Sequence, residues 1–269
     1  MSNGTAISTK TKNSGCENCP QARDGHLKRL GINLNKVDFV VALAGNPNVG
    51  KSTVFNALTG LNQHTGNWPG KTVTRAEGGF QYAEANYKMV DLPGAYSLIS
   101  KSADEEIARN FILFGKPDVT LIVVDATRLE RNLNLVLQIL EITDKVVICL
   151  NLMDEAERMG LKIDIRSLSR DLGVPVISTI ARYRKGLQEL LNTLSEVATG
   201  QLITKPKVRS YGNGKFSRAV KSISSRLKIE FPEIENTTWL SERLLDEDED
   251  IIASLKSGEL LDHARGDVE

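Results

Sequence analysis

The stretch Gly45-Asn46-Pro47-Asn48-Val49-Gly50-Lys51-Ser52 decides how this chain of 269 residues folds. It fits the phosphate-loop pattern G-x-x-x-x-G-K-[ST]. An apolar run rich in β-branched residues, 37–44, precedes it, and residues 51–58 have the pattern of a helix. Because a strand before the loop and a helix after it are the context that this pattern requires, the sequence predicts a phosphate-binding loop.

The residue types of this loop suit a triphosphate. Glycines let backbone N–H groups point at phosphates without a clashing Cβ, and the helix N-terminus adds positive potential. Lys51 is predicted to bind the β and γ phosphates, and the Ser52 hydroxyl to ligate Mg²⁺, which prefers hard oxygen ligands. The predicted phosphate-binding residues are Gly45, Asn46, Pro47, Asn48, Val49, Gly50, Lys51, Ser52 and Thr53.

Apolar runs and helical patterns alternate downstream of the loop. The runs cover residues 87–90, 119–124, 146–150 and 174–177, and the helical patterns cover 103–114, 129–141, 165–172 and 187–197. This alternation predicts βαβ units, and with the phosphate loop an α/β P-loop GTPase (Ras-like) fold with a doubly wound, mostly parallel sheet. The runs end at polar residues, where the carboxyl ends of such strands bind ligands.

The chain divides into three predicted parts. Residues 1–36 are polar, lack periodicity and are predicted to be a flexible extension. Residues 37–200 are predicted to form a GTP-binding domain. In residues 201–269 apolar side chains recur at helical spacing after a linker, which predicts a small C-terminal helical domain.

Composition limits the class of protein. Lys plus Arg and Asp plus Glu are both 34, so bulk electrostatic attraction to nucleic acid or anionic lipid is not expected. No apolar run approaches the roughly 18 residues that cross a bilayer, so this chain alone is predicted to be soluble and cytosolic. Cys149 is predicted to be a buried thiol. Cys16 and Cys19 form a C-x-x-C pair, which leaves open free thiols or a regulatory iron or zinc contact.

Asp91-Leu92-Pro93-Gly94 is predicted to sense the γ-phosphate. Asp91 follows a predicted strand and would hold Mg²⁺ through a water. Gly94 would offer its N–H to the γ-phosphate and release it after hydrolysis. Asp-x-x-Gly alone is a common turn. Its distance downstream of a phosphate loop strengthens the prediction of a γ-phosphate sensor.

Asn151-Leu152-Met153-Asp154 is predicted to recognise the base. The Asp154 carboxylate would accept hydrogen bonds from guanine N1–H and the exocyclic amine, which adenine does not offer in that arrangement. Asn151 would brace the loops around the base, although Asn-x-x-Asp is also compatible with a helix cap. Leu152 replaces the Lys of the usual Asn-Lys-x-Asp pattern, which predicts modest affinity and fast release. The last base-contacting loop is predicted to be Ser178-Thr179-Ile180-Ala181 from its place after a strand.

Three further stretches are similar to one family. Residues 66–73 (G-N-W-P-G-K-T-V) resemble the first switch of the FeoB ferrous iron transporters, residues 91–98 (D-L-P-G-A-Y-S-L) resemble their second switch, and residues 124–133 resemble another stretch typical of them. The matches run in the family's order over residues 40–186. The chain therefore resembles the cytosolic N-terminal GTPase region of this family.

The resemblance implies a setting for the chain. It implies GTP binding and hydrolysis that regulate ferrous iron passage, at the cytoplasmic face of the inner membrane. It implies a helical domain leading to a membrane portion that this sequence does not contain. The implied partners are GTP, that membrane domain, small accessory Feo proteins and a possible homo-oligomer, with no nucleic acid.

The resemblance also assigns roles by position. Thr72 would ligate Mg²⁺ and close over the γ-phosphate, with Gly70 and Lys71 in the same nucleotide-binding segment. Asn48 would hold K⁺ near the phosphates, or only brace the loop. A cation there neutralises charge where an arginine finger would. The implied catalytic residues are Lys51, Asn48, Thr72 and Gly94.

Hydrolysis is predicted to be slow. Ala95 follows Gly94, so neither a hydroxyl nor a glutamine orients the attacking water there. Two alternatives remain. A ribosome- or RNA-associated GTPase would carry a basic RNA-binding module, which residues 201–269 lack. A regulatory module would bind nucleotide without turnover.

Overall fold

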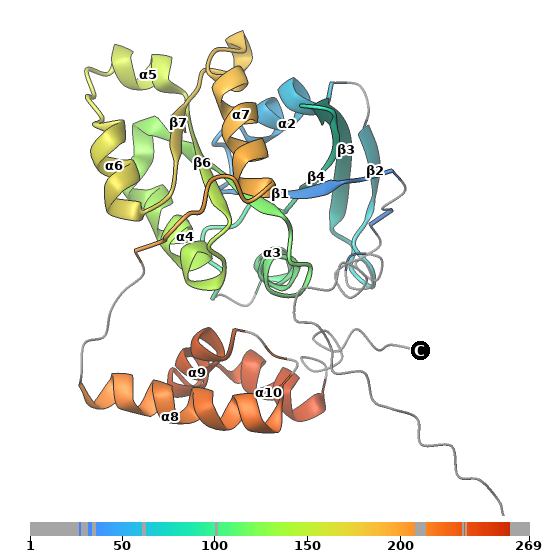
Figure 1. The fold of residues 1–269 in the computed structure, drawn as a ribbon, viewed down its shortest axis with the longest axis vertical. Helices are drawn as coiled ribbons and strands as arrows, with labels where there is room; N and C mark the ends of the chain where they lie inside the picture. The colour runs from blue at the N-terminus through green and yellow to red at the C-terminus, as the bar shows by residue number, and fades with distance from the viewer. Residues whose placement is uncertain are drawn as a thin grey trace, which may run out of the picture.

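The computed structural model describes residues 27, 32–33, 36–60, 63–99, 102–207, 214–232, 234 and 236–258. Cys16 and Cys19 lie outside them. The described residues form a seven-stranded sheet with helices on both faces, and the helices α8, α9 and α10 lie together beside it (Figure 1). The predicted α/β fold with a C-terminal helical group is confirmed.

The sheet has the strand order β2-β3-β4-β1-β5-β6-β7. The strands are β1 Phe39–Gly45, β2 Gln63–Asn67, β3 Thr74–Tyr82, β4 Ala85–Asp91, β5 Val119–Asp125, β6 Val146–Asn151 and β7 Val176–Ser178. β4, β1, β5, β6 and β7 pair in parallel with one another, in that order. Their runs of buried, β-branched residues are typical of strands covered on both faces.

The strands β2 and β3 are antiparallel additions that the sequence analysis missed. Every residue of β2 is exposed, and β3 contains the glycine pair Gly78 and Gly79, so neither strand has the apolar pattern of a covered one. Ala83 and Glu84 connect β3 to β4 with φ values of 47° and 65°. That tight turn usually uses Gly or Asn, so its sequence carries no hairpin signal.

Helices cover both faces of the sheet and bury two apolar layers. The helices and 3₁₀ turns of the sheet domain are α2 Lys51–Thr59, α3 Ala103–Phe114, η1 Ala126–Arg128, α4 Leu129–Ile142, α5 Met153–Arg158, α6 Ile165–Leu172, η2 Ala181–Tyr183 and α7 Leu187–Ala198. One layer contains residues of α2 and α7, such as Phe55 and Leu190. The other contains residues of α3, α4, α5 and α6, such as Phe111 and Ile139.

The helical group packs on the α3 and α4 side of the sheet domain (Figure 1). It consists of α8 Lys215–Glu230, α9 Thr237–Leu245 and α10 Glu249–Ser257. Leu227, Trp239 and Ile251 belong to the same apolar layer as α3 and α4. Leu27 and Ile32 also belong to it and are 0% and 2% exposed. Packed side chains thus occur at two positions within residues 1–36, the segment that the sequence predicts to be a flexible extension.

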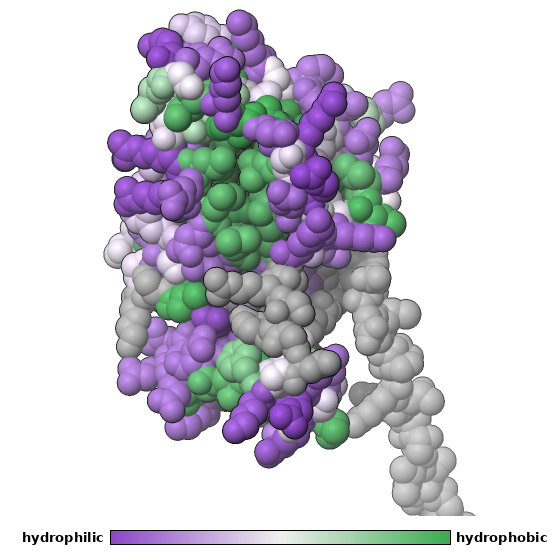
Figure 2. Space-filling view, turned by 90° about the vertical axis from the view of Figure 1, so that its left-hand side faces the viewer, coloured by the Kyte–Doolittle hydropathy of each residue, from purple (hydrophilic) through white to green (hydrophobic). Residues whose placement is uncertain are grey.

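The surface is mixed rather than uniformly polar. Figure 2 faces the side that carries α4, α5 and α6, and it shows an apolar area bordered by hydrophilic residues. Leu137 of α4 and Leu161, between α5 and α6, are among the exposed large apolar side chains. None of the helices in the described part of the chain is both long and apolar enough to span a bilayer.

Candidate nucleotide-binding site

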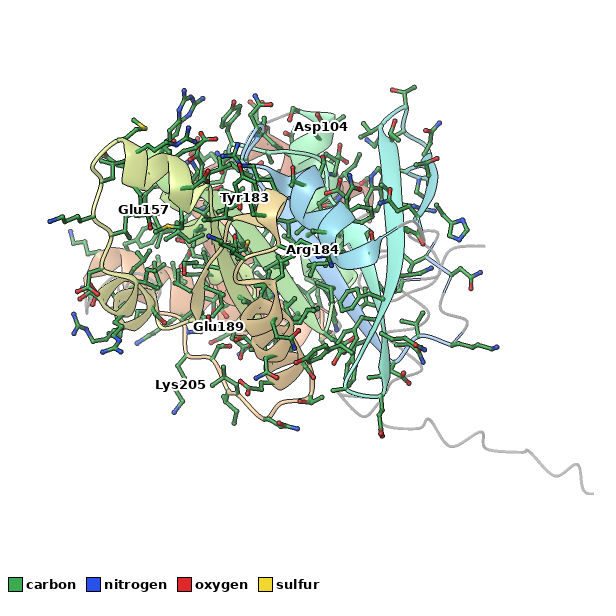
Figure 3. All side chains as sticks on the ribbon, turned by 90° about the horizontal axis from the view of Figure 1, so that it is seen from above. Asp104, Glu157, Tyr183, Arg184, Glu189 and Lys205 are labelled. Atoms are coloured by element: carbon green, nitrogen blue, oxygen red, sulfur yellow. The ribbon has the colours of Figure 1, made fainter. Side chains whose placement is uncertain are left out.

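The site lies at the edge of the sheet where the parallel strands end. The phosphate loop follows β1, Asn151 closes β6, and the loop after β7 continues into η2, which contacts α2. Figure 3 looks onto the molecule from above and shows Tyr183 and Arg184 near the start of α7, beside α2. Segments far apart in sequence therefore meet where an open α/β sheet binds ligands.

The phosphate loop has the backbone of an anion-binding turn. Asn48 and Gly50 have φ values of 66° and 83°, and α2 begins at Lys51. Ser52 lies exposed in the first turn of α2. Left-handed residues before a helix start turn successive N–H groups toward one point, where the helix dipole favours an anion.

Lys51 joins the phosphate loop to the predicted γ-phosphate sensor. Its Nζ donates to Asp91 Oδ1 at 2.5 Å and to the Leu92 carbonyl at 2.6 Å. Burial raises the pKa of Asp91, and the nearby Lys51 ammonium opposes that rise. The ammonium and the carboxylate therefore stand together at the point where a phosphate and its Mg²⁺ would bind.

The segment after Asp91 lies directly on the phosphate loop. The Ala95 N–H donates to the Gly45 carbonyl at 3.3 Å, and the Leu92 N–H to the Leu43 carbonyl at 3.0 Å. A Cβ on Gly94 would come within 3.3 Å of Pro47 Cγ. Glycine at position 94 therefore allows the closest approach of its N–H to the loop.

Asn151 makes the brace that the sequence predicts. Its Nδ2 donates to the Val49 carbonyl at 3.1 Å, and its Oδ1 accepts from the Ala181 N–H at 3.1 Å and from Thr179 Oγ1 at 3.2 Å. Asn151 is 2% exposed. Because one buried amide satisfies both loops, it fixes the phosphate loop relative to the loop after β7.

Asp154 lies in the first turn of α5, with Leu152 before it at a φ of 60°. Its Oδ2 accepts from Arg182 Nη2, and Arg158 Nη2 lies 3.5 Å away. Its Oδ1 is buried and has no hydrogen-bond partner among the described residues. Unpaired buried oxygens are uncommon, so this atom is a candidate acceptor for a ligand.

The residues predicted to hold metals fit the chemistry of those ions. Ser52 and Asp91 supply the hard oxygens that Mg²⁺ prefers, and Lys51, next to Ser52, bonds Asp91. Asn48 is exposed on the phosphate loop, with an amide oxygen suited to K⁺. Thr72 is exposed in the segment between β2 and β3. Mg²⁺ bound by Ser52, Asp91 and Thr72 would neutralise the charge of the phosphates.

The segment between β2 and β3 is held against α3 by two side chains. Trp68 is 3% exposed and packs edge-on against Phe111, with ring centroids 5.6 Å apart. Lys71 forms an ion pair of 2.9 Å with Glu106 of α3. The indole therefore packs in the core, and Gly70, Lys71 and Thr72 stand beyond it, on the exposed part of the segment.

Sequence reasoning missed Arg182 as a site residue. The predicted base loop ends at Ala181, one residue earlier, because its place after a strand is its only sequence signal. A long cationic side chain adjacent to that loop is the signal that was available. Its contact with Asp154 joins residues 28 apart in sequence.

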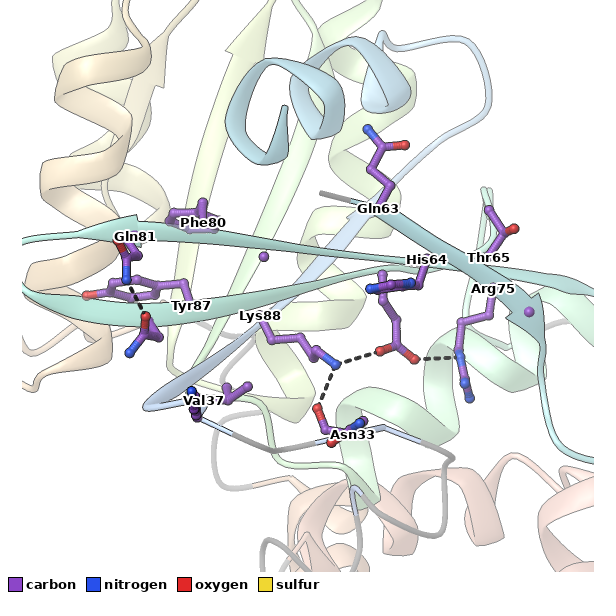
Figure 4. Close-up of a pocket in the computed structure, with 15 residues that line it drawn as sticks. Asn33, Val37, Gln63, His64, Thr65, Arg75, Phe80, Gln81, Tyr87 and Lys88 are labelled. Carbon is purple, nitrogen blue, oxygen red and sulfur yellow. Dashed lines mark hydrogen bonds and ion pairs between the residues drawn. The ribbon is translucent and has the colours of Figure 1, made fainter. Parts of the chain in front are cut away.

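A cavity of about 910 Å³ lies elsewhere, on the outer strands β2, β3 and β4. Figure 4 shows Lys88 and Arg75 in it, and each forms an ion pair of 2.9 Å with one carboxylate oxygen of Glu77. Lys88 also donates to the Asn33 carbonyl at 2.6 Å. The Glu77 carboxylate is therefore paired on both oxygens, in contrast to that of Asp154.

Gly50→Ala is expected to destabilise the protein by about 2–4 kcal/mol, measured by urea unfolding without nucleotide. The left-handed backbone disfavours a Cβ, and that Cβ would lie 2.5 Å from Asn151 Nδ2 and displace the brace. Gly258→Ala is the matched control. Gly258 ends α10 with the same left-handed φ of 83° and has open space around it, so about 1–2 kcal/mol is expected. An equal loss of unfolding free energy in the two variants would show that the Asn151 side chain moves away from the new Cβ at no energetic cost.

Comparison with known proteins agrees with this site. A family model described as Ferrous iron transport protein B matches residues 39–194. The Fe(2+) transporter FeoB of Escherichia coli (strain K12) is 46% identical over 154 residues, which are 56% of this chain and 20% of that protein. The chain thus spans about a fifth of the length of the curated relatives it matches.

Solved structures extend the similarity to the helical group. The cytosolic domain of the T. maritima FeoB iron transporter in a GDP form has a TM-score of 0.74 and 37% identity, over 82% of this chain and 85% of that chain. Its GMPPNP form has a TM-score of 0.73 and 37% identity, over 80% and 84%. Both alignments cover more of the chain than residues 39–194.

Proposed function

Because this chain belongs to the ferrous iron transport protein B (FeoB) family, we propose that it binds GTP and hydrolyses it slowly as a switch for ferrous iron transport. The observation that carries the proposal is the Asn151 brace, which holds a phosphate loop and a base loop at one sheet edge. The T. maritima relative was solved with GDP and with GMPPNP, a matching ligand class.

We infer that the phosphates and the base of the nucleotide bind separate segments. The loop from Gly45 to Thr53 would wrap the phosphates, with Lys51 turning from Asp91 to the β and γ phosphates. Asp154 would accept from the guanine edge, with Asn151, Leu152, Met153 and the loop of Ser178, Thr179, Ile180 and Ala181 around the base. A charged acceptor at this edge favours guanine over adenine, because it pairs two guanine donors.

The conformational switch would act through the backbone of the predicted γ-phosphate sensor, residues 91–94. The Asp91, Leu92, Pro93 and Gly94 backbone rests on the phosphate loop, so a γ-phosphate at Gly94 N–H would pull on it directly. The chain beyond Ala95 reaches α4, since Gln138 Oε1 accepts from the Leu98 N–H at 2.6 Å. The α4 side also packs against the helical group, which gives a route toward a membrane domain.

The setting follows from the family. We infer that the chain works at the cytoplasmic face of the inner membrane as part of a longer transporter. Its membrane domain would be the partner that the nucleotide state controls. Small accessory Feo proteins and a homo-oligomer remain further proposed partners.

Fluorescent-nucleotide binding tests the function itself. GTP and GDP are expected to bind at least about 100-fold more tightly than ATP, because a carboxylate at the base edge leaves adenine unpaired. The measurement is equilibrium titration with Mg²⁺ present. Equal affinities for GTP and ATP would refute the assignment of Asp154.

Potassium is expected to raise the single-turnover rate of GTP hydrolysis relative to sodium by about tenfold or more, since one fixed cation stabilises transition-state charge. Asn48→Ala should remove this difference while hydrolysis in NaCl changes little. Asn192 of α7 is exposed and accepts from the Tyr82 hydroxyl at 2.9 Å, beside the start of β4 and so at the opposite edge of the sheet from the phosphate loop. Asn192→Ala is therefore the matched control. Identical rates in both salts for the wild type would remove K⁺ from the proposal.

A further inference from the structure

Arg182 binds the carboxylate of Asp154, the group proposed to accept hydrogen bonds from the guanine edge. Asp154 Oδ2 accepts from Arg182 Nη2, whereas Oδ1 is buried without a partner among the described residues. The Asp154 side chain is 18% exposed and that of Arg182 is 46% exposed. A guanine edge with two N–H donors needs both carboxylate oxygens, and the guanidinium holds one of them while the other is unpaired in the described part of the chain.

The backbone beneath Arg182 is fixed. Ile180 and Lys185 exchange backbone hydrogen bonds of 3.1 and 3.3 Å, which close the turn that carries Arg182 at its tip. The guanidinium also stacks 4.7 Å from the centroid of the Tyr183 ring. Because the turn is closed, Arg182 can leave Asp154 only by rotating its own side chain, and the Tyr183 ring offers it a surface beside the site.

We propose that Arg182 is an intramolecular competitor of the guanine base, a guanidinium that binds the base-reading carboxylate and must be displaced before a guanine nucleotide docks. The proposal rests on the proposed function, because it takes Asp154 as the base reader. Guanine and guanidinium offer the same pattern, N–H donors in one plane aimed at a carboxylate. Each bond that Arg182 makes to Oδ2 is therefore one that the base must replace.

The proposed competition predicts whether removing Arg182 raises or lowers the affinity for GDP. Removing a positive charge near a phosphate ligand ordinarily weakens binding of an anion. Removing a group that competes with the base, in contrast, strengthens nucleotide binding. A partly exposed ion pair of this kind corresponds to a factor of about two to five in affinity. Arg182→Ala is therefore expected to bind GDP about two- to fivefold more tightly, with slower dissociation.

The experiment measures dissociation of fluorescent GDP from the full chain by stopped flow, for wild type, Arg182→Ala and Arg182→Gln. Arg184→Asn is the matched control, since it removes the same charge from the same turn and Asn tolerates the Arg184 φ of 56°. It should leave release unchanged or faster. In the Asp154→Asn background with xanthosine diphosphate as the probe, Arg182→Ala should lose its effect, because an amide does not ion-pair with Arg182.

The possible outcomes distinguish a failure of the competitor proposal from a failure of the proposed function on which it rests. Wild type that binds neither GDP nor GTP would refute the proposed function. Wild type that binds GDP, with Arg182→Ala releasing it at the same rate or faster, would refute only the competitor. An equal slowing by Arg184→Asn would also refute it, because the effect would then be general to the turn.

Discussion

Lys51→Ala is expected to lower GTP affinity by at least about 100-fold, because the variant loses charge-assisted bonds to two phosphates. The change has a second, independent readout in the protein alone. Without Lys51, burial raises the pKa of Asp91 unopposed. A carboxyl with a raised pKa in the folded state favours folding less as pH increases, so the variant should lose stability relative to wild type as pH rises from acid to neutral.

Both readouts need a lysine control at the opposite edge of the sheet. Lys145 is exposed just before β6, so Lys145→Ala removes the same charge far from the carboxyl ends of the strands. It should change neither GTP affinity nor the pH dependence of unfolding. Fluorescent GTP titration and thermal unfolding at pH 5 and pH 8 provide the measurements. GTP affinity in Lys51→Ala within a few-fold of wild type would contradict a phosphate site at this loop.

Asp154→Asn is expected to weaken GDP binding by about 10²–10⁴-fold, since two hydrogen bonds to a charged acceptor are lost or inverted. The substitution should also reverse the base preference. Xanthine carries a carbonyl where guanine carries its exocyclic amine, and the new amide donates to that carbonyl. Competition between GDP and xanthosine diphosphate for a fluorescent nucleotide measures both effects.

Asp144→Asn is the matched control for this change. Asp144 is exposed before β6, on the opposite edge of the sheet from α5. It should leave the affinity for GDP and the order of preference unaltered. Should Asp154→Asn keep GDP as its better ligand, Asp154 would be only the first-turn residue of α5, as its place there also allows.

The parallel part of the fold was predictable because its strands are buried on both faces. Runs such as 119–124 and 146–150 are continuous, apolar and β-branched, and the structure contains strands there. The hairpin of β2 and β3 was not predictable in this way. β2 is held by backbone bonds to β3 and exposes every side chain, so its residues carry no periodic signal.

The site was predictable to the extent that its chemistry is local. A loop that points backbone N–H groups at phosphates needs glycines and a helix start within eight residues, so its sequence states its geometry. The roles of Asp91, Gly94 and Asp154 were inferred from order along the chain. Their contacts with Lys51, Pro47 and Arg182 join residues 28 to 47 positions apart, and those contacts depend on which strand ends meet.

The amino-acid sequence by itself determined the phosphate loop, the parallel strands and the family resemblance, because each depends on residues close together in the chain. Only the tertiary structure decided that Trp68 packs in the core, that β2 extends the sheet, and that Arg182 sits on Asp154. Those features arise from burial and charge pairing between distant segments. No local pattern encodes such pairing, since each partner alone is an ordinary polar or aromatic residue.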